Sequence, residues 1–389
     1  MQVQLKSLVV VLSVLTVAPS SSNADQPDSA LKYLKLLEDA IEHSRQQLSV
    51  ITASAESAAQ RLLSGGSIWA GGRQRDFAPE AGGRAGGLMF VKGLAGNSPA
   101  SGDIVLYAVP GRLCEQDRAL FETWPEDVQV VTFSSDPDAV FKSTESPGLR
   151  IGDVKHDQIC PADTVVNIIN MWAWTGELTS AFTRRGKMPI LYQSIGIEGG
   201  LDRIGKYSGQ TFHKDMQISP IPEGKLFTDY LDAIDKMLGE LQTDRLSTLQ
   251  RAAQWWRNAG EKNSVALTIG HMFPAHFQDE RAPQRCTLAG NRSPEPNEKF
   301  ALYLGYQRAP QNLIDEAVKT GRKLVYASVE RGKSAETAKN VVYFEPGWPL
   351  PDSCVEVPGY DIPILPASGV INAAIYWAVL AEVCAGELE

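Results

Sequence analysis

The sequence contains two copies of one long segment, and this repeat limits the possible folds more than any other feature. The stretch CPADTVVNIINMWAWTGE (160–177) aligns without gaps with LPASGVINAAIYWAVLAE (365–382). Three shorter matches precede it in order along the chain: AAQ at 58–60 with AAQ at 252–254, Gly72 with Gly270, and Arg112 with Arg308. Ordered matches at a spacing of about 200 residues indicate one structural unit that is used twice.

Predicted strands alternate with predicted helices in each half. Apolar residues recur at helical spacing from Leu34 to Leu62, where Ser-Gly-Gly ends the pattern, and again from Phe227 through 245–260. Further helices are predicted from Glu115 and over 164–186. The predicted strands are 67–70, 103–109, 128–133 and 189–194 in the first half and 264–270, 299–306 and 323–329 in the second.

Such alternation is typical of a parallel sheet with helices on both faces. We therefore predict an α/β protein made of two tandem doubly wound domains, flavodoxin-like or Rossmann-like, each a three-layer α/β/α unit with a parallel sheet. The first domain is predicted over 25–213, a linker over 214–225, and the second domain over 226–389.

Residues 1–24 have the pattern of a cleaved secretory leader. A positive start, MQVQLK, precedes a short apolar run at 7–18, and Ser22 and Ala24 stand at −3 and −1 of a cleavage site before Asp25. The pattern predicts a secreted or periplasmic protein that is cleaved after Ala24, with no membrane insertion after cleavage.

Composition excludes several classes of partner. The formal net charge is −9 and no basic block is present, which argues against nucleic acid as a partner. The five cysteines are scattered and contain no Cys-x-x-Cys pair, so no zinc site is expected. We expect neither a metal nor a cofactor.

Two motifs resemble the SIS (sugar isomerase) domain family. The stretch GRQRDFAPEAGGRAGGL (72–88) is similar to the family's first strand–loop–helix, and PILPASGVINAAIYWAVLAE (363–382) is similar to its closing helix. The resemblance covers both halves of the chain and implies a protein that binds a carbohydrate derivative, a phosphosugar or a related compound. It also implies a pseudo-dimer within one chain, or a homodimer.

The same resemblance suggests an aldose–ketose isomerase. That reaction needs a carboxylate or imidazole to move a proton between neighbouring carbons, and Glu80 is the matching carboxylate. The alternative is an ion pair between Glu80 and Arg84, four residues further along a helix. His271 follows the second-half strand and is the candidate acid/base partner, although a loop histidine without a catalytic role fits as well.

Ligand-binding candidates follow the ends of the predicted strands and the start of the closing helices, because such folds bind ligands there. Glycines after the first strand would let backbone N–H groups approach the ligand. The candidates are Gly72, Arg73, Gln74, Arg84, Gly111, Arg112, Arg308, Asn167, Asn372 and Ser368.

The loops depart from the family pattern. Its Ser/Thr-rich phosphate loop reads AVPGRL (108–113) in the first half and LGYQRAPQ (304–311) in the second, and Gln74 stands where a serine is expected. Arg112 and Arg308 are candidates to replace the missing hydroxyl donors, or they are solvated surface arginines. Two further functions remain open: an exported two-lobed solute-binding protein, and a catalytically inactive SIS scaffold.

Overall fold

The computed structural model describes residues 28–142, 148–150, 159–268, 276–290, 292–333 and 338–385, so the predicted leader lies outside the described residues. The helices are α1 (Ser29–Arg45), α2 (Leu48–Leu63), α3 (Phe77–Gly83), α4 (Glu115–Glu122), α5 (Asp163–Arg184), α6 (Gly200–Tyr207), α7 (Lys225–Thr243), α8 (Leu246–Ala259), the short 3-10 helix η1 (Glu261–Asn263), α10 (Gln311–Thr320) and α11 (Ser368–Ala385).

The strands form two parallel sheets with the same internal order. The first sheet is β2 (Val91–Gly93), β1 (Ile68–Gly72), β3 (Ile104–Ala108), β4 (Gln129–Ser134), β5 (Phe141–Lys142). The second is β9 (Thr287–Ala289), β8 (Ser264–Thr268), β10 (Phe300–Leu304), β11 (Lys323–Ala327), β12 (Val341–Phe344). Two antiparallel pairs complete the set: β6 (Gly148–Arg150) with β7 (Ile159–Pro161), and β13 (Ser353–Val355) with β14 (Ile364–Pro366). The predicted α/β class with parallel sheets is confirmed.

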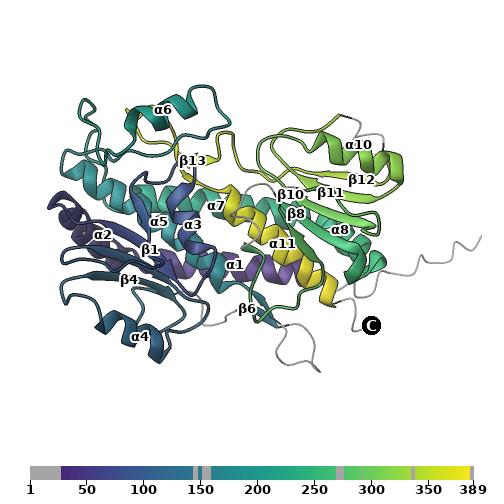
Figure 1. Ribbon diagram of the computed structural model, residues 1–389, viewed down its shortest axis with the longest axis horizontal. Coiled ribbons are helices and arrows are strands. Elements are labelled where there is room, and N and C mark those ends of the chain that lie inside the picture. The colour runs from purple at the N-terminus through teal and green to yellow at the C-terminus, as the bar shows by residue number, and fades with distance from the viewer. Residues whose placement is uncertain are drawn as a thin grey trace, which may run out of the picture.

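Both faces of each sheet are covered, which explains why the central strands are apolar throughout. Every residue of β3 and of β10 is buried. One face of each sheet joins a single large core that also contains α1, α2, α5, α7, α8 and α11. The other face of the first sheet packs near α4, and that of the second packs against α10. Figure 1 shows the two sheets at opposite ends of the molecule with α1, α5, α7 and α11 between them.

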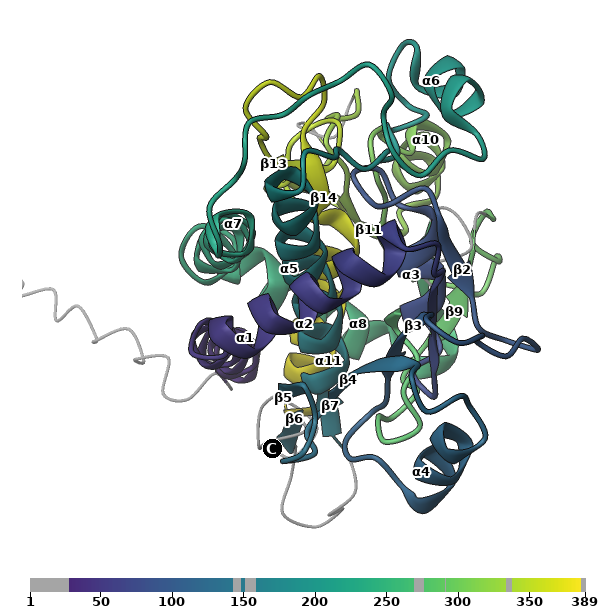
Figure 2. The ribbon, with the colours of Figure 1, turned by 90° about the vertical axis from the view of Figure 1, so that its left-hand side faces the viewer.

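The two halves exchange their first helices. Helix α1 packs against α11 of the second half, and α7 packs against α5 of the first half. Figure 2 shows α1 and α7 on the same side of the molecule. Two glutamates that align in the predicted repeat bind these helix starts: Glu382 Oε2 accepts from the Ala30 N–H (3.0 Å), and Glu177 Oε2 accepts from the Gly224 N–H (2.8 Å). A carboxylate at a helix N-terminus satisfies free N–H groups and complements the helix dipole.

Three expectations about secondary structure were wrong in detail, two helical patterns and one strand. The first helical pattern is broken into α1 and α2, and the second into α7 and α8. The predicted strand at 189–194 forms only isolated bridges, from Pro189 to Phe212 and from Leu191 to Leu88.

Helix α11 has the length and apolarity of a membrane span, but 94% of that stretch is buried inside the protein. All five cysteines are free thiols.

The glycines of the RAGGL motif lie between the two halves. Gly86 has a φ of +80°, and a Cβ there would lie 2.4 Å from Ser353 Oγ and 2.6 Å from Leu365 N. Its N–H donates to Tyr192 O (2.7 Å), and its carbonyl accepts from the Leu365 N–H (3.1 Å). Gly86 therefore permits close contact between chain segments, and its N–H group already has a protein partner.

Candidate functional site

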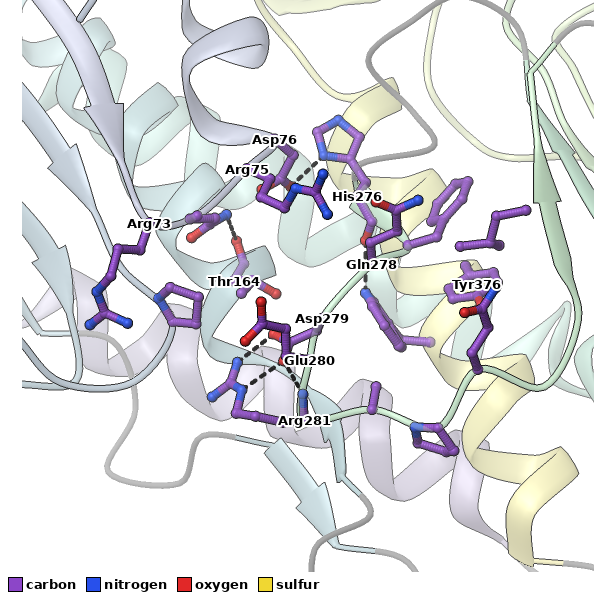
Figure 3. A pocket seen from close by; sticks show the side chains of 18 residues that line it. Arg73, Arg75, Asp76, Thr164, His276, Gln278, Asp279, Glu280, Arg281 and Tyr376 are labelled. Carbon is purple, nitrogen blue, oxygen red and sulfur yellow. Dashed lines mark hydrogen bonds and ion pairs between the residues drawn. The ribbon is translucent and has the colours of Figure 1, made fainter. Parts of the chain in front are cut away.

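A cavity of about 820 Å³ opens between the halves, near the ends of β1 and β8. Residues 73–76 follow β1, residues 276–284 come from the segment between β8 and β9, and Thr164, Tyr376 and Trp377 come from the closing helices. Figure 3 shows Arg75 and Asp76 on one side of this cavity and Arg281 on the other. The remaining lining residues are Pro110 and Leu288.

One wall of the cavity is aromatic. The rings of Phe277 and Tyr376 are stacked with centroids 4.5 Å apart, and the Trp377 ring meets Tyr376 edge-on at 4.9 Å. Two charged lining residues are exposed and form no ion pair with any described residue: Arg75 and Glu280. The cavity thus combines an apolar wall with polar groups that are free to bind a ligand.

Charged side chains behind the cavity form a buried cluster across the halves. His276 Nδ1 lies 2.5 Å from Asp76 Oδ2, and His276 Nε2 lies 3.0 Å from Glu80 Oε2. Glu80 Oε1 accepts from Trp172 Nε1 (3.2 Å) and lies 3.6 Å from Arg84 Nε. Arg84 Nη2 in turn donates to Asp352 Oδ2 at 2.9 Å.

The cluster favours charged side chains. Although burial alone would lower the pKa of His276, the Asp76 and Glu80 carboxylates raise it to about 9. Burial alone would raise the pKa of Glu80, but the Arg84 and His276 cations hold it below its usual value. The raised pKa and the carboxylate beside each ring nitrogen favour the imidazolium form of His276, in which both nitrogens donate.

A second arginine joins the halves beside the cavity. Arg281 donates to Asp163 at the start of α5 through Nη1 (2.9 Å) and Nη2 (2.7 Å), and to Asp279 through Nε (2.8 Å) and Nη2 (2.6 Å). Asp163 Oδ2 also accepts from the Gly111 N–H at 2.6 Å. This ion pair fixes the segment that forms one side of the cavity.

Two of the predicted site residues line the cavity, Arg73 and Gln74. Arg73 pairs with Asp117 (3.0 Å), and Gln74 donates to Thr164 O (2.8 Å). His271 lies outside the described residues. The predicted residues that do not line the cavity are Gly72, Glu80, Arg84, Gly111, Arg112, Arg308, Asn167, Asn372 and Ser368.

Most of these residues are bound to the protein itself. Asn167 Nδ2 donates to Gln74 Oε1 (2.9 Å), Asn372 Nδ2 donates to Gly305 O (2.9 Å), and Ser368 Oγ donates to Asp352 Oδ2 (2.9 Å). A Cβ at Gly72 would lie 2.0 Å from Ala108 O, so this glycine allows β1 to end close to β3. Arg112 and Arg308 are exposed and form no ion pair with any described residue.

Sequence reasoning missed most of the cavity. Thr164 lies within the repeated segment 160–177, but Asp76 and the segment 276–284 were not predicted as parts of the site. The predicted repeat could have indicated both arginines, because they follow the first long strand of each half at nearly the same distance. Arg84 lies 12 residues after Gly72, the end of β1, and Arg281 lies 13 residues after Thr268, the end of β8. Among the described residues, no group of three or more His, Cys, Asp or Glu is arranged to hold a metal ion.

Comparison with protein-family models and with curated proteins found no match. Among solved structures, the chain is 11% identical to the C-terminal domain of glucosamine-fructose-6-phosphate aminotransferase from Francisella tularensis, covering 94% of this chain and 97% of that one at a TM-score of 0.46. A "putative sugar binding protein" from Salmonella typhimurium LT2 is 9% identical (91% and 99% covered, TM-score 0.45). A "putative phosphosugar isomerase" from Silicibacter pomeroyi DSS-3 is 10% identical (92% and 98% covered, TM-score 0.44).

These neighbours are similar to this chain in fold alone. At these identities and TM-scores the likeness carries no argument about what this chain binds, so its function must be argued from its own contacts.

Proposed function

We propose that this protein binds a carbohydrate derivative in the cavity between its halves. The single observation that carries the proposal is the cavity's composition: the guanidinium of Arg75, the carboxylate of Glu280 and the amide of Gln278 lie beside the aromatic wall. Sugars offer hydroxyl groups to polar side chains such as these, and the buried rings of Phe277, Tyr376 and Trp377 form the apolar wall next to them. The volume of about 820 Å³ lies within the range of small-molecule sites.

We propose binding without isomerisation. An isomerase base must reach the two carbons between which the proton moves. Glu80 is fully buried, is absent from the cavity lining, and is held by His276, Trp172 and Arg84. His276 does line the cavity, but both of its ring nitrogens are bound to carboxylates. These contacts favour a binding role over proton transfer by either group.

Replacing Arg75 by alanine is expected to weaken ligand binding by about tenfold, because a charged hydrogen bond to a ligand typically contributes about 1.5–3 kcal/mol. Isothermal titration calorimetry with neutral, amino and phosphorylated sugars measures the effect. Arg308→Ala is the matched control, since Arg308 is also exposed and unpaired among the described residues but does not line the cavity. Equal losses in both variants, or no binding of any of these sugars by the wild type, would contradict the proposal.

We also propose that the protein acts outside the cytoplasm. The support is the leader pattern of residues 1–24, with its apolar run and its small residues Ser22 and Ala24. Mass spectrometry of the protein expressed with its full sequence is expected to find Asp25 at the N-terminus. An intact Met1 in the purified protein would rule out cleavage.

A further inference from the structure

The loop after β3 and the start of α5 form a set of donors suited to an anion. Asp163 Oδ2 accepts from the Gly111 N–H (2.6 Å) and from Arg281 Nη1 (2.9 Å). Asp163 Oδ1 accepts from Arg281 Nη2 (2.7 Å) and from the Thr164 N–H (2.9 Å). A guanidinium that donates two hydrogen bonds, together with backbone N–H groups at a helix start, is an arrangement that binds tetrahedral oxyanions. Here the fully buried carboxylate of Asp163 occupies it.

The second half contains a corresponding arrangement. Asp352 Oδ1 accepts from the Ser368 N–H (2.7 Å) and the Ala367 N–H (3.2 Å) at the start of α11. Asp352 Oδ2 accepts from Ser368 Oγ and from Arg84 Nη2, both at 2.9 Å. In each half the arginine comes from the opposite half. The carboxylate comes from the helix itself in one case and from the segment between β12 and β13 in the other, so different residues fill the same kind of position.

The position held by Asp163 adjoins the cavity, because Thr164 and Arg281 both line it. Arg281 is already shared between two carboxylates, Asp163 and Asp279. A phosphoryl group placed beside Arg281 would therefore meet the two carboxylates that this guanidinium already binds. Like charges at such distances repel strongly where water is largely excluded.

We propose that Asp163 is a built-in anion that determines ligand specificity. Its carboxylate takes the place of a phosphoryl group at the Gly111–Arg281 position, so the carbohydrate derivative bound in the cavity carries no phosphoryl group there. The statement about the ligand rests on the proposed function, whereas the occupied anion position does not.

Inorganic phosphate is the probe for the anion position. In Asp163→Ala the Gly111 N–H and one side of the Arg281 guanidinium lose their partner, and space opens for an oxyanion. This variant is expected to have a lower melting temperature than the wild type in chloride, and to recover specifically when phosphate replaces chloride at equal ionic strength. Asp163→Asn is the matched control: it removes the charge but fills the space, so phosphate is expected to give no recovery. Asp163→Ser repeats the test if the alanine variant does not fold.

Calorimetry with glucose and glucose 6-phosphate, and with glucosamine and glucosamine 6-phosphate, tests the ligand class. The wild type is expected to bind the unphosphorylated member of a pair at least about tenfold more tightly, a difference of about 1.4 kcal/mol. Tighter binding of the phosphorylated member would overturn the specificity proposal. No phosphate-specific recovery in either the alanine or the serine variant would overturn the built-in anion. If the wild type binds no sugar, the proposed function fails, and the phosphate experiment alone decides on the built-in anion.

Discussion

Replacing Arg84 by methionine is expected to lower the free energy of unfolding by about 3–5 kcal/mol, because the change leaves the buried carboxylate of Asp352 without its counter-charge and removes one of the two cations beside Glu80. The guanidinium of Arg84 is buried between Glu80, at 3.6 Å, and Asp352, at 2.9 Å. Methionine keeps much of the side-chain volume, so the decrease in the free energy of unfolding comes mainly from the removed positive charge. Urea unfolding followed by circular dichroism measures it, with Arg112→Met, an exposed arginine without an ion pair among the described residues, as the control for the substitution.

The origin of this loss can be tested with a second substitution. Arg84→Met combined with Asp352→Asn removes one of the uncompensated charges, and the double variant is expected to be more stable than Arg84→Met alone. Burial raises the pKa of Asp352, so the defect of the single variant is also expected to shrink as the pH falls and buried carboxylates take up protons. A loss below about 1 kcal/mol, the scale of an exposed ion pair, would contradict the buried cluster.

The central strands of both sheets could be predicted from sequence because their signal is local. Strands β3 and β10 are continuous apolar runs, as expected for parallel strands buried on both faces. The edge strands β2, β5 and β9 have only two or three residues each and were missed because so short a segment carries no periodic pattern. The segment 189–194 has the composition of a strand, but it pairs only at single residues with Leu88 and Phe212.

The site was harder to predict because its contacts join distant parts of the chain. The end of β1 pointed to Arg73 and Gln74, since ligands bind at the carboxyl ends of parallel strands, and both residues line the cavity. Their ligand-binding role stays a prediction. The partners of Arg84 and Arg281 lie in the opposite half, at Asp352 and Asp163. No local spacing specifies such a pair.

Glu80 is a further residue whose contacts could not all be predicted from local spacing. Its position four residues before Arg84 allowed both a catalytic base and an ion pair, and the structure contains the ion pair. The third partner, His276, comes from the second half and could not be inferred from helical spacing. The catalytic assignment of Glu80 stays a prediction, which its burial does not favour.

The free energy of unfolding is expected to decrease as the pH rises from about 6.5 to about 9. One group contributes roughly 3 kcal/mol of this decrease, since each unit of pKa shift corresponds to about 1.4 kcal/mol. That group is His276, whose pKa the Asp76 and Glu80 carboxylates raise to about 9 in the folded protein against the opposing effect of burial. A raised folded-state pKa adds stability that is fully present below the unfolded-state pKa of the histidine. This contribution is lost as the pH rises through the folded-state pKa. Urea unfolding at a series of pH values measures the decrease.

His276→Asn separates this effect from the other groups that titrate in the same range. The amide cannot carry a positive charge, so Asp76 and Glu80 lose their shared cation and the variant is expected to be destabilised at pH 6. Because the variant lacks the titrating group, the difference in free energy of unfolding between His276→Asn and the wild type is expected to narrow as the pH rises to 9. A His213→Asn control keeps His276 while removing the second buried histidine of the described residues, whose pKa burial lowers, and should retain the alkaline decrease. If the wild type and His276→Asn show parallel stability curves, His276 is neutral in the folded protein and the imidazolium between two carboxylates is excluded.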